Sequence, residues 1–211
     1  HIPGLKVYMP SNPADAKGLM RQALKGSDPT IFLEHRWLHS QLGDVSEIED
    51  NKEIEKPKVF RRGSVITLVS YSFGVVECLK ACDWLSEKYG IECELIDLRV
   101  LRPLKTSIII ESVNKTKKIL VVDQSVSTCG VGAEIISQTI DNLGGLANLQ
   151  VGRLSYPDQS VPTSPYQASD YYYGVSGIIS KVLNMLGVEE AEMPKISGFG
   201  DQPDPTFEGP F

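Results

Sequence analysis

The chain has 211 residues, and 41% of them are hydrophobic, a fraction typical of globular domains. Its formal net charge is −6 with a pI near 5.2, and such a surface repels phosphate backbones, so we expect no nucleic-acid partner. The longest apolar runs, such as Ile119–Val122, fall far short of the ~20 residues that a membrane-spanning helix needs, so we expect no membrane partner.

The first forty residues predict a small strand–helix–strand unit. Leu5–Met9 is short and β-prone, and Ala14–Leu24 repeats its apolar residues at helical spacing. Ser11 or Asn12 can cap that helix, because short polar side chains accept hydrogen bonds from the first free amides. The compact apolar run Pro29–Glu34 predicts a buried strand.

Two acidic segments flank the rest of the chain. Residues 41–58 crowd six acidic side chains into a stretch with few apolar ones, which indicates an exposed connector. Residues 187–211 combine six acidic side chains with prolines and glycines, which indicates a flexible tail.

Between these segments, residues 59–186 alternate strands with helices. The alternation predicts a mostly parallel sheet covered by helices on both faces. The predicted strands are Ser64–Ser70, Glu92–Leu98, Lys118–Asp123 and Leu149–Leu154, and the predicted helices are Phe73–Tyr89, Thr106–Asn114, Val131–Leu143 and Ala168–Leu186.

Common catalytic motifs are missing from the sequence. There are three histidines and neither HExxH, GxSxG nor a phosphate-binding loop, so His35 and His39 are expected to be structural or exposed. The four cysteines lack zinc-site spacing and are expected to be reduced. We therefore assign no catalytic, cofactor-binding or metal-binding residue.

Two local patterns have two interpretations each. The glycine-rich turn at residues 129–134 enters a helix after a strand, which suits either an anion site or tight packing of the helix on the sheet, although the full GxGxxG pattern is absent. Arg99 and Arg102 follow a predicted strand, where α/β folds place ligands, and they suit an interface or a salt bridge equally well.

Several phrases, taken in order, resemble the beta subunit of pyruvate and branched-chain 2-oxo acid dehydrogenase E1 components. The opening His1-Ile2-Pro3-Gly4-Leu5-Lys6-Val7 and the later run at residues 14–19 are similar to that family's HxPGLKV and DAKGL phrases. Residues 29–35 (PTIFLEH), 96–104 (IDLRVLRPL) and 130–135 (GVGAEI) continue the match. The resemblance implies that residues 1–40 end a pyrimidine-binding α/β domain and that residues 59–186 form a transketolase C-terminal-like domain.

The resemblance also implies a function for the parent enzyme, which would decarboxylate a 2-oxo acid on thiamine diphosphate with Mg and acylate a lipoyl-bearing E2. The family's catalytic histidine and cofactor-facing acid lie N-terminal to residue 1, and its diphosphate–magnesium motif belongs to the alpha subunit or an N-terminal domain. Gly43-Asp44-Val45 and Gly200-Asp201-Gln202 do not complete that motif. We therefore expect neither cofactor to bind this chain alone.

This chain would then serve assembly with an E1 alpha subunit, docking of E2, and pairing into a homodimer. It would work in a bacterial cytoplasm or a mitochondrial matrix and would not be secreted. Three consecutive tyrosines on the last predicted helix span about 200° of its circumference, so at least one ring should face outward. The candidates for partner contacts are His1, Arg99, Arg102, Gly130, Gly132, Glu134, Tyr171, Tyr172 and Tyr173.

Two alternatives remain open. The chain could belong to another transketolase-like enzyme, either a transketolase or a deoxyxylulose-phosphate synthase, whose assembled form would bind sugar phosphates. It could also be a non-catalytic interaction domain.

Overall fold

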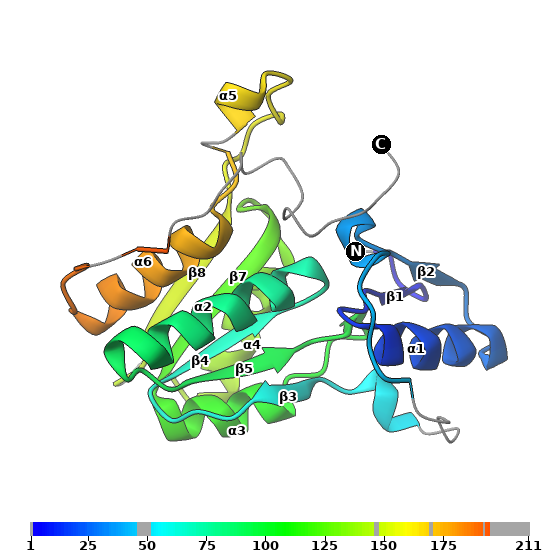
Figure 1. Ribbon diagram of the computed structural model, residues 1–211. Helices are drawn as coiled ribbons and strands as arrows, with labels where there is room; N and C mark the ends of the chain where they lie inside the picture. Colours follow the sequence, from blue (N-terminus) through cyan, green and yellow to red (C-terminus); the bar gives the residue numbers. More distant parts are fainter. Residues whose placement is uncertain (1, 46–51, 146–147, 169–170, 192, 195–211) are drawn as a thin grey trace.

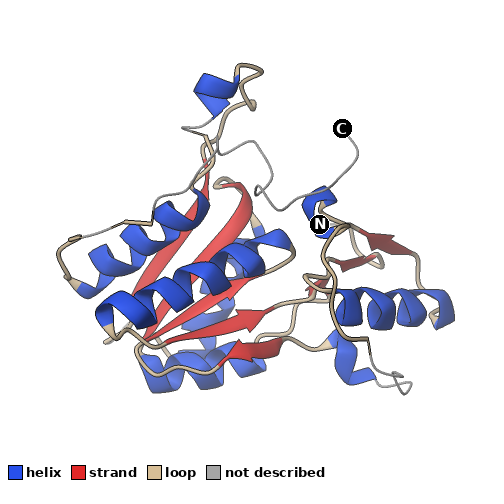
Figure 2. Cartoon of the chain, in the orientation of Figure 1, coloured by secondary structure: helices blue, strands red, loops and turns tan. Residues whose placement is uncertain are grey.

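A computed structural model describes residues 2–45, 52–145, 148–168, 171–191 and 193–194. It contains a larger α/β layer and a smaller one beside it (Figure 1; Figure 2). The larger sheet has the strand order β3-β5-β4-β7-β8, and the smaller has the order β2-β1-β6. All neighbours in the larger sheet are parallel except β3 and β5. The mostly parallel sheet expected from the sequence is therefore confirmed.

The elements follow the chain in this order: β1 (Lys6–Tyr8), α1 (Pro13–Lys25), β2 (Thr30–Phe32), η1 (Arg36–Leu38), η2 (Lys52–Glu55), β3 (Lys58–Arg61), β4 (Ile66–Ser70), α2 (Phe73–Tyr89), β5 (Cys93–Asp97), β6 (Val100–Arg102), α3 (Ser107–Thr116), β7 (Lys118–Val126), α4 (Val131–Leu143), β8 (Gln150–Tyr156), α5 (Pro165–Ala168) and α6 (Gly174–Leu186).

Helices cover both faces of the larger sheet (Figure 1). Successive side chains of a strand point to opposite faces, and β7 shows the result. Leu120 and Val122 pack in one core with α2 and α6, whereas Ile119 and Val121 pack in a second core with α3 and α4. All four side chains are fully buried. The continuous apolar run that predicted this strand thus reflects burial on both faces.

The smaller sheet combines strands from both expected domains, with β1 and β2 from residues 1–40 and β6 from residues 59–186. β1 and β2 are parallel and joined through α1, and β6 adds an antiparallel strand on the other side of β1. The sequence did not predict β6, because it has three residues and its partner lies more than ninety residues earlier in the chain. The pairing joins the two α/β layers through backbone hydrogen bonds.

The run Pro29–Glu34 was wrongly predicted to be a buried strand. β2 lies at the edge of the smaller sheet, and Ile31 and Leu33 are 42% and 44% exposed. Phe32 packs against the core around Tyr8, whereas Ile31, which points to the opposite face of the strand, is exposed. An apolar run therefore indicated a strand here without indicating its burial.

The last predicted helix, Ala168–Leu186, was also wrong at its start. The structure has the short α5 and then α6 from Gly174, with the three tyrosines preceding α6. Gly174 has a φ of +53°, in the left-handed region, so the chain turns before the helix begins. The tyrosines are not consecutive positions on one helix, and the circumference argument for an outward ring does not apply.

The expected connector is partly in contact with the smaller sheet. Ile54 packs against the core around Tyr8, and Glu55 accepts a hydrogen bond from the Tyr8 hydroxyl. β3 begins at Lys58. Residues 46–51 of the connector and 195–211 of the tail lie outside the described residues. Among the helices that are described, none has both the length and the apolar character to cross a membrane.

Candidate functional site

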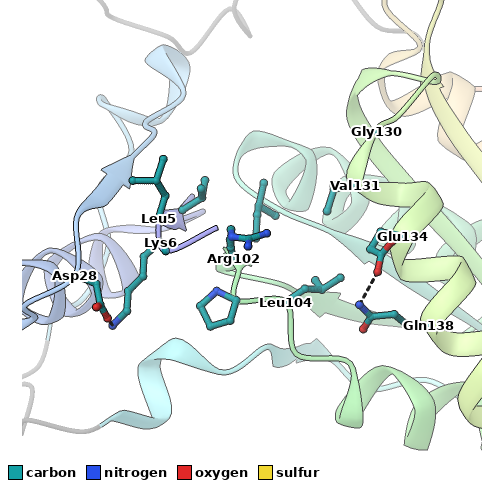
Figure 3. A pocket seen from close by; sticks show the side chains of 13 residues that line it. Leu5, Lys6, Asp28, Arg102, Leu104, Gly130, Val131, Glu134 and Gln138 are labelled. Atoms are coloured by element: carbon teal, nitrogen blue, oxygen red, sulfur yellow. Dashed lines mark hydrogen bonds and ion pairs between the residues drawn. The ribbon is translucent and has the colours of Figure 1, made fainter. Parts of the chain in front are cut away.

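A cleft of about 850 Å³ lies between the smaller sheet and α4 (Figure 3). One wall comes from the start of β1 and the end of β6 with the loop that follows it. The opposite wall is the first two turns of α4. The side chains labelled in the figure belong to Leu5, Lys6, Asp28, Arg102, Leu104, Val131, Glu134 and Gln138.

Side chains of both charges line this cleft. Lys6 turns toward Asp28, with Nζ 3.5 Å from its carboxylate and 3.6 Å from that of Glu55. Arg102 ends β6 on the first wall, and Glu134 on the α4 wall accepts a hydrogen bond from Gln138 at 2.8 Å (Figure 3). Mixed charges on two separate elements suit the surface of another polypeptide better than a small ligand carrying several like charges.

At the glycine-rich N-terminus of α4, the position of an anion is occupied by the carboxylate of Asp123 from the same chain. The backbone N–H of Gly132 donates to Asp123 Oδ2 at 2.8 Å, and the hydroxyls of Tyr71 and Ser125 donate to Oδ1 at 2.6 and 2.8 Å. A Cβ at Gly130 or Gly132 would lie 2.7 or 2.9 Å from Oδ2. The Asp123 carboxylate takes the place of an external anion at this helix, so the structure supports the packing interpretation of these glycines.

Arg99, which follows β5, and Arg102, which ends β6, lie in different surroundings. Arg99 is buried and forms an ion pair with Asp15 of α1, whereas Arg102 lines the cleft. The salt-bridge interpretation therefore describes Arg99. The cleft brings together Arg102, Gly130 and Glu134 from the predicted set, and His1 lies outside the described residues.

The three tyrosines surround Tyr156 at the end of β8, away from the cleft. The Tyr156 ring lies 5.3 Å from that of Tyr171, 5.2 Å from that of Tyr172 and 4.9 Å from that of Tyr173, measured between centroids. Tyr171 is buried, and the other two are half-buried. Much of the surface of these three rings is therefore buried by contacts within this chain. Their role in contacts with a partner stays a prediction.

The described residues do not fit the diphosphate–magnesium part of a thiamine site. No group of three or more His, Cys, Asp and Glu side chains among them is arranged to hold a metal ion. The glycine-rich N-terminus of α4 is hydrogen-bonded to Asp123. No catalytic step can be derived through that cofactor from the residues of this chain.

A second pocket, of about 250 Å³, lies near the carboxyl ends of β7 and β8. Burial raises the pKa of its Glu77 carboxyl to about 7. Sequence reasoning missed this pocket, and the one available signal was Glu77 itself, an acid within the apolar face of α2. His35, expected to be structural or exposed, also lines this pocket and accepts a hydrogen bond from the backbone N–H of Trp37 at 3.3 Å.

Two families match this chain. "Transketolase, C-terminal domain" matches residues 55–177, and "Transketolase, pyrimidine binding domain" matches residues 1–40. By shape, a "Split gene transketolase, inactive beta4 tetramer" superposes with a TM-score of 0.69 at 15% identity, over 90% of this chain and 59% of that one. That likeness concerns the fold alone.

Several curated proteins that are similar to this chain are beta subunits. The "Pyruvate dehydrogenase E1 component subunit beta, mitochondrial" of Saccharomyces cerevisiae is 38% identical over 89% of this chain and 52% of its own length. The corresponding Bacillus subtilis subunit is 39% identical over 77% of this chain and 50% of its own. The "Acetoin:2,6-dichlorophenolindophenol oxidoreductase subunit beta" of Cupriavidus necator is 37% identical over 78% and 48%. The chain thus spans about half the length of these relatives.

Proposed function

The chain belongs to the transketolase C-terminal domain family, and on that premise we propose that it is the C-terminal part of an E1 beta-type subunit of a 2-oxo acid dehydrogenase. The observation that carries the proposal is the 38% identity to the yeast mitochondrial pyruvate dehydrogenase beta subunit, which extends over 89% of this chain. The parent enzyme decarboxylates a 2-oxo acid with thiamine diphosphate and acylates a lipoyl-bearing E2.

Within that enzyme, this chain serves assembly and docking. The cleft beside α4 offers Arg102 and Glu134 on opposite walls, and such a mixed-charge surface supports a polypeptide partner, namely the E1 alpha subunit or E2. Mg and most cofactor contacts come from the partner. Pairing of two copies completes the assembly. The relatives are bacterial and mitochondrial, which supports a bacterial cytoplasm or a mitochondrial matrix.

A second candidate substrate is acetoin. Two of the similar curated proteins, from Cupriavidus necator and Bacillus subtilis, are named as acetoin oxidoreductase beta subunits, at 37% and 34% identity. The identities to the two kinds of relative differ little, so both substrates enter the assay.

The test is purification of the assembled enzyme through a tag on this chain, from the cell that encodes it. The complex is assayed with pyruvate, a branched-chain 2-oxo acid and acetoin, with 2,6-dichlorophenolindophenol as the electron acceptor. Thiamine-dependent turnover of a 2-oxo acid is expected. Turnover of acetoin without turnover of either 2-oxo acid would identify acetoin as the substrate. A complex that turns over sugar phosphates instead, or a chain that co-purifies with no enzyme, would contradict the proposal.

A further inference from the structure

We propose that the pocket formed by His35, Trp37, Phe73, Glu77 and Tyr156 binds a small organic cation of the alkylammonium class. This site is separate from the cleft beside α4 and from the proposed decarboxylase function. Its volume of about 250 Å³ lies below the ~300 Å³ at which pockets for drug-sized ligands begin, so it suits a ligand of few atoms.

Aromatic rings form two sides of the pocket. On one side the Phe73 ring stacks on that of His35 with centroids 4.7 Å apart, and the Trp37 ring meets it edge-on at 5.2 Å. On the other side the rings of Tyr156 and Tyr172 meet edge-on at 5.2 Å. Electron-rich ring faces attract cations, and a cage of several rings is a common way to bind alkylammonium groups.

A carboxyl group completes this arrangement. Glu77 follows Phe73 by one turn of α2 and lines the same pocket. Gln124 Nε2 donates to its Oε2 at 3.4 Å, which is a long hydrogen bond. Burial raises the pKa of this carboxyl to about 7, so the described residues around it stabilise its ionised form poorly. A bound cation supplies the missing counter-charge.

Two basic side chains lie near Glu77 but do not fill this role. Arg36 lines the pocket and is exposed, so water and salt screen its charge. Lys80 lies on the same helix, also exposed, and lowers the Glu77 pKa less than burial raises it. The carboxyl therefore retains a raised pKa with both residues in place.

The experiment compares a cation with its neutral isostere. Choline and 3,3-dimethyl-1-butanol, which has a carbon atom in place of the quaternary nitrogen, are titrated into the full chain at pH 8 by calorimetry. We expect saturable choline binding at least about tenfold tighter than that of the alcohol. Equal affinity would show an apolar pocket with no preference for charge, and absence of choline binding would show no cation site. Either result would overturn the proposal.

Matched variants locate the binding. Glu77→Gln keeps the shape of the side chain and should remove most of the preference for choline, while Trp37→Leu should weaken choline binding through loss of a ring face. Glu134→Gln makes the same chemical change on an exposed helix position in the other cleft and should leave choline affinity unchanged. Undiminished choline binding by Glu77→Gln would contradict the assignment of that carboxyl.

The pH profile gives a further readout. Choline affinity should rise from pH 6.5 to 8 as Glu77 ionises, and Glu77→Gln should flatten the rise. Burial raises the pKa of Tyr156, Tyr173 and Cys78, away from this window. Burial also lowers the pKa of His35 below its usual value of 6.5. Arg36, Lys80 and Tyr172 also lie around the pocket or Glu77, and the comparison with Glu77→Gln separates the carboxyl group from all of these side chains. Failure of this titration leaves the enzyme assay unaffected, so the two proposals are tested separately.

Discussion

Arg99 makes a two-pronged ion pair with Asp15. Its Nε donates to Oδ2 at 2.9 Å and its Nη2 donates to Oδ1 at 2.7 Å. Both side chains are buried, Asp15 on α1 of the smaller layer and Arg99 just after β5 of the larger. The pair ties together the two layers that β6 also joins, so the first forty residues and the larger sheet are coupled inside this chain.

Asp15→Ala should destabilise the chain by about 3–5 kcal/mol, because it leaves the Arg99 guanidinium buried without a counter-charge. Chemical denaturation followed by circular dichroism measures the change. Asp83→Ala is the matched control, since Asp83 also lies on a helix and pairs with an arginine, Arg61, but is exposed. The control should lose about 1 kcal/mol or less. Equal losses in the two variants would contradict the structural role given to the buried pair.

Val121→Asp should destabilise the chain by several kcal/mol, because Val121 is fully buried in β7 between α3 and α4 and a carboxylate there would have no partner. Val161→Asp places the same charge at a position that is 50% exposed and should be nearly neutral. Thermal melting compares the two. An unchanged melting temperature for Val121→Asp would contradict the assignment of β7 to the core.

The stability contributed by two buried carboxyl groups should fall as the pH rises from about 4 to about 7. Burial raises the pKa of Glu77 from 4.5 to about 7 and that of Asp97 from 3.8 to about 6. The folded chain therefore holds these protons more tightly than the unfolded chain does. Their contribution is fully present below the unfolded pKa values and is lost as the pH passes the folded ones.

Glu77→Gln should remove part of this fall and raise the stability at pH 8 by about 1–3 kcal/mol relative to the original chain. Urea denaturation at pH 5.5 and pH 8 measures how the free energy of unfolding changes with pH in the original chain and in Glu77→Gln. Glu134→Gln is the control. If Glu77→Gln leaves this change in the free energy of unfolding unaltered, the Glu77 carboxyl does not titrate between pH 5.5 and pH 8.

A homodimer is the expected state in solution. The exposed side chains of Ile31 and Leu33 leave an apolar face on the smaller sheet, and the half-buried rings of Tyr172 and Tyr173 offer a second contact. Light scattering at micromolar concentration should give twice the 23.2 kDa chain mass. A mass that stays at one chain over the whole concentration range would count against self-association.

Local patterns predicted most of the larger sheet. The helix at Phe73–Tyr89 was predicted with the bounds that the structure shows, because its apolar spacing is regular and Gly90 ends it in a left-handed conformation. What the sequence did not reveal depends on distant contacts. β6 exists through its pairing with β1, and the burial of β2 depends on what covers its second face.

The candidate sites were harder to predict for the same reason. Arg99 and Arg102 are three residues apart and look alike in the sequence, but one contacts α1 and the other lines the cleft. The small aromatic pocket draws on η1, α2, β7 and β8, whose proximity no local pattern encodes. Glu77 within an apolar helix face was the only sign of it.

The most direct test of the central claim is calorimetric titration with thiamine diphosphate and Mg²⁺, carried out on this chain alone and on the assembled complex purified through a tag on it. The account predicts that the chain alone shows no tight binding and that the assembled complex binds the cofactor saturably. A micromolar dissociation constant for the chain alone, or no binding by the assembled complex, would contradict it.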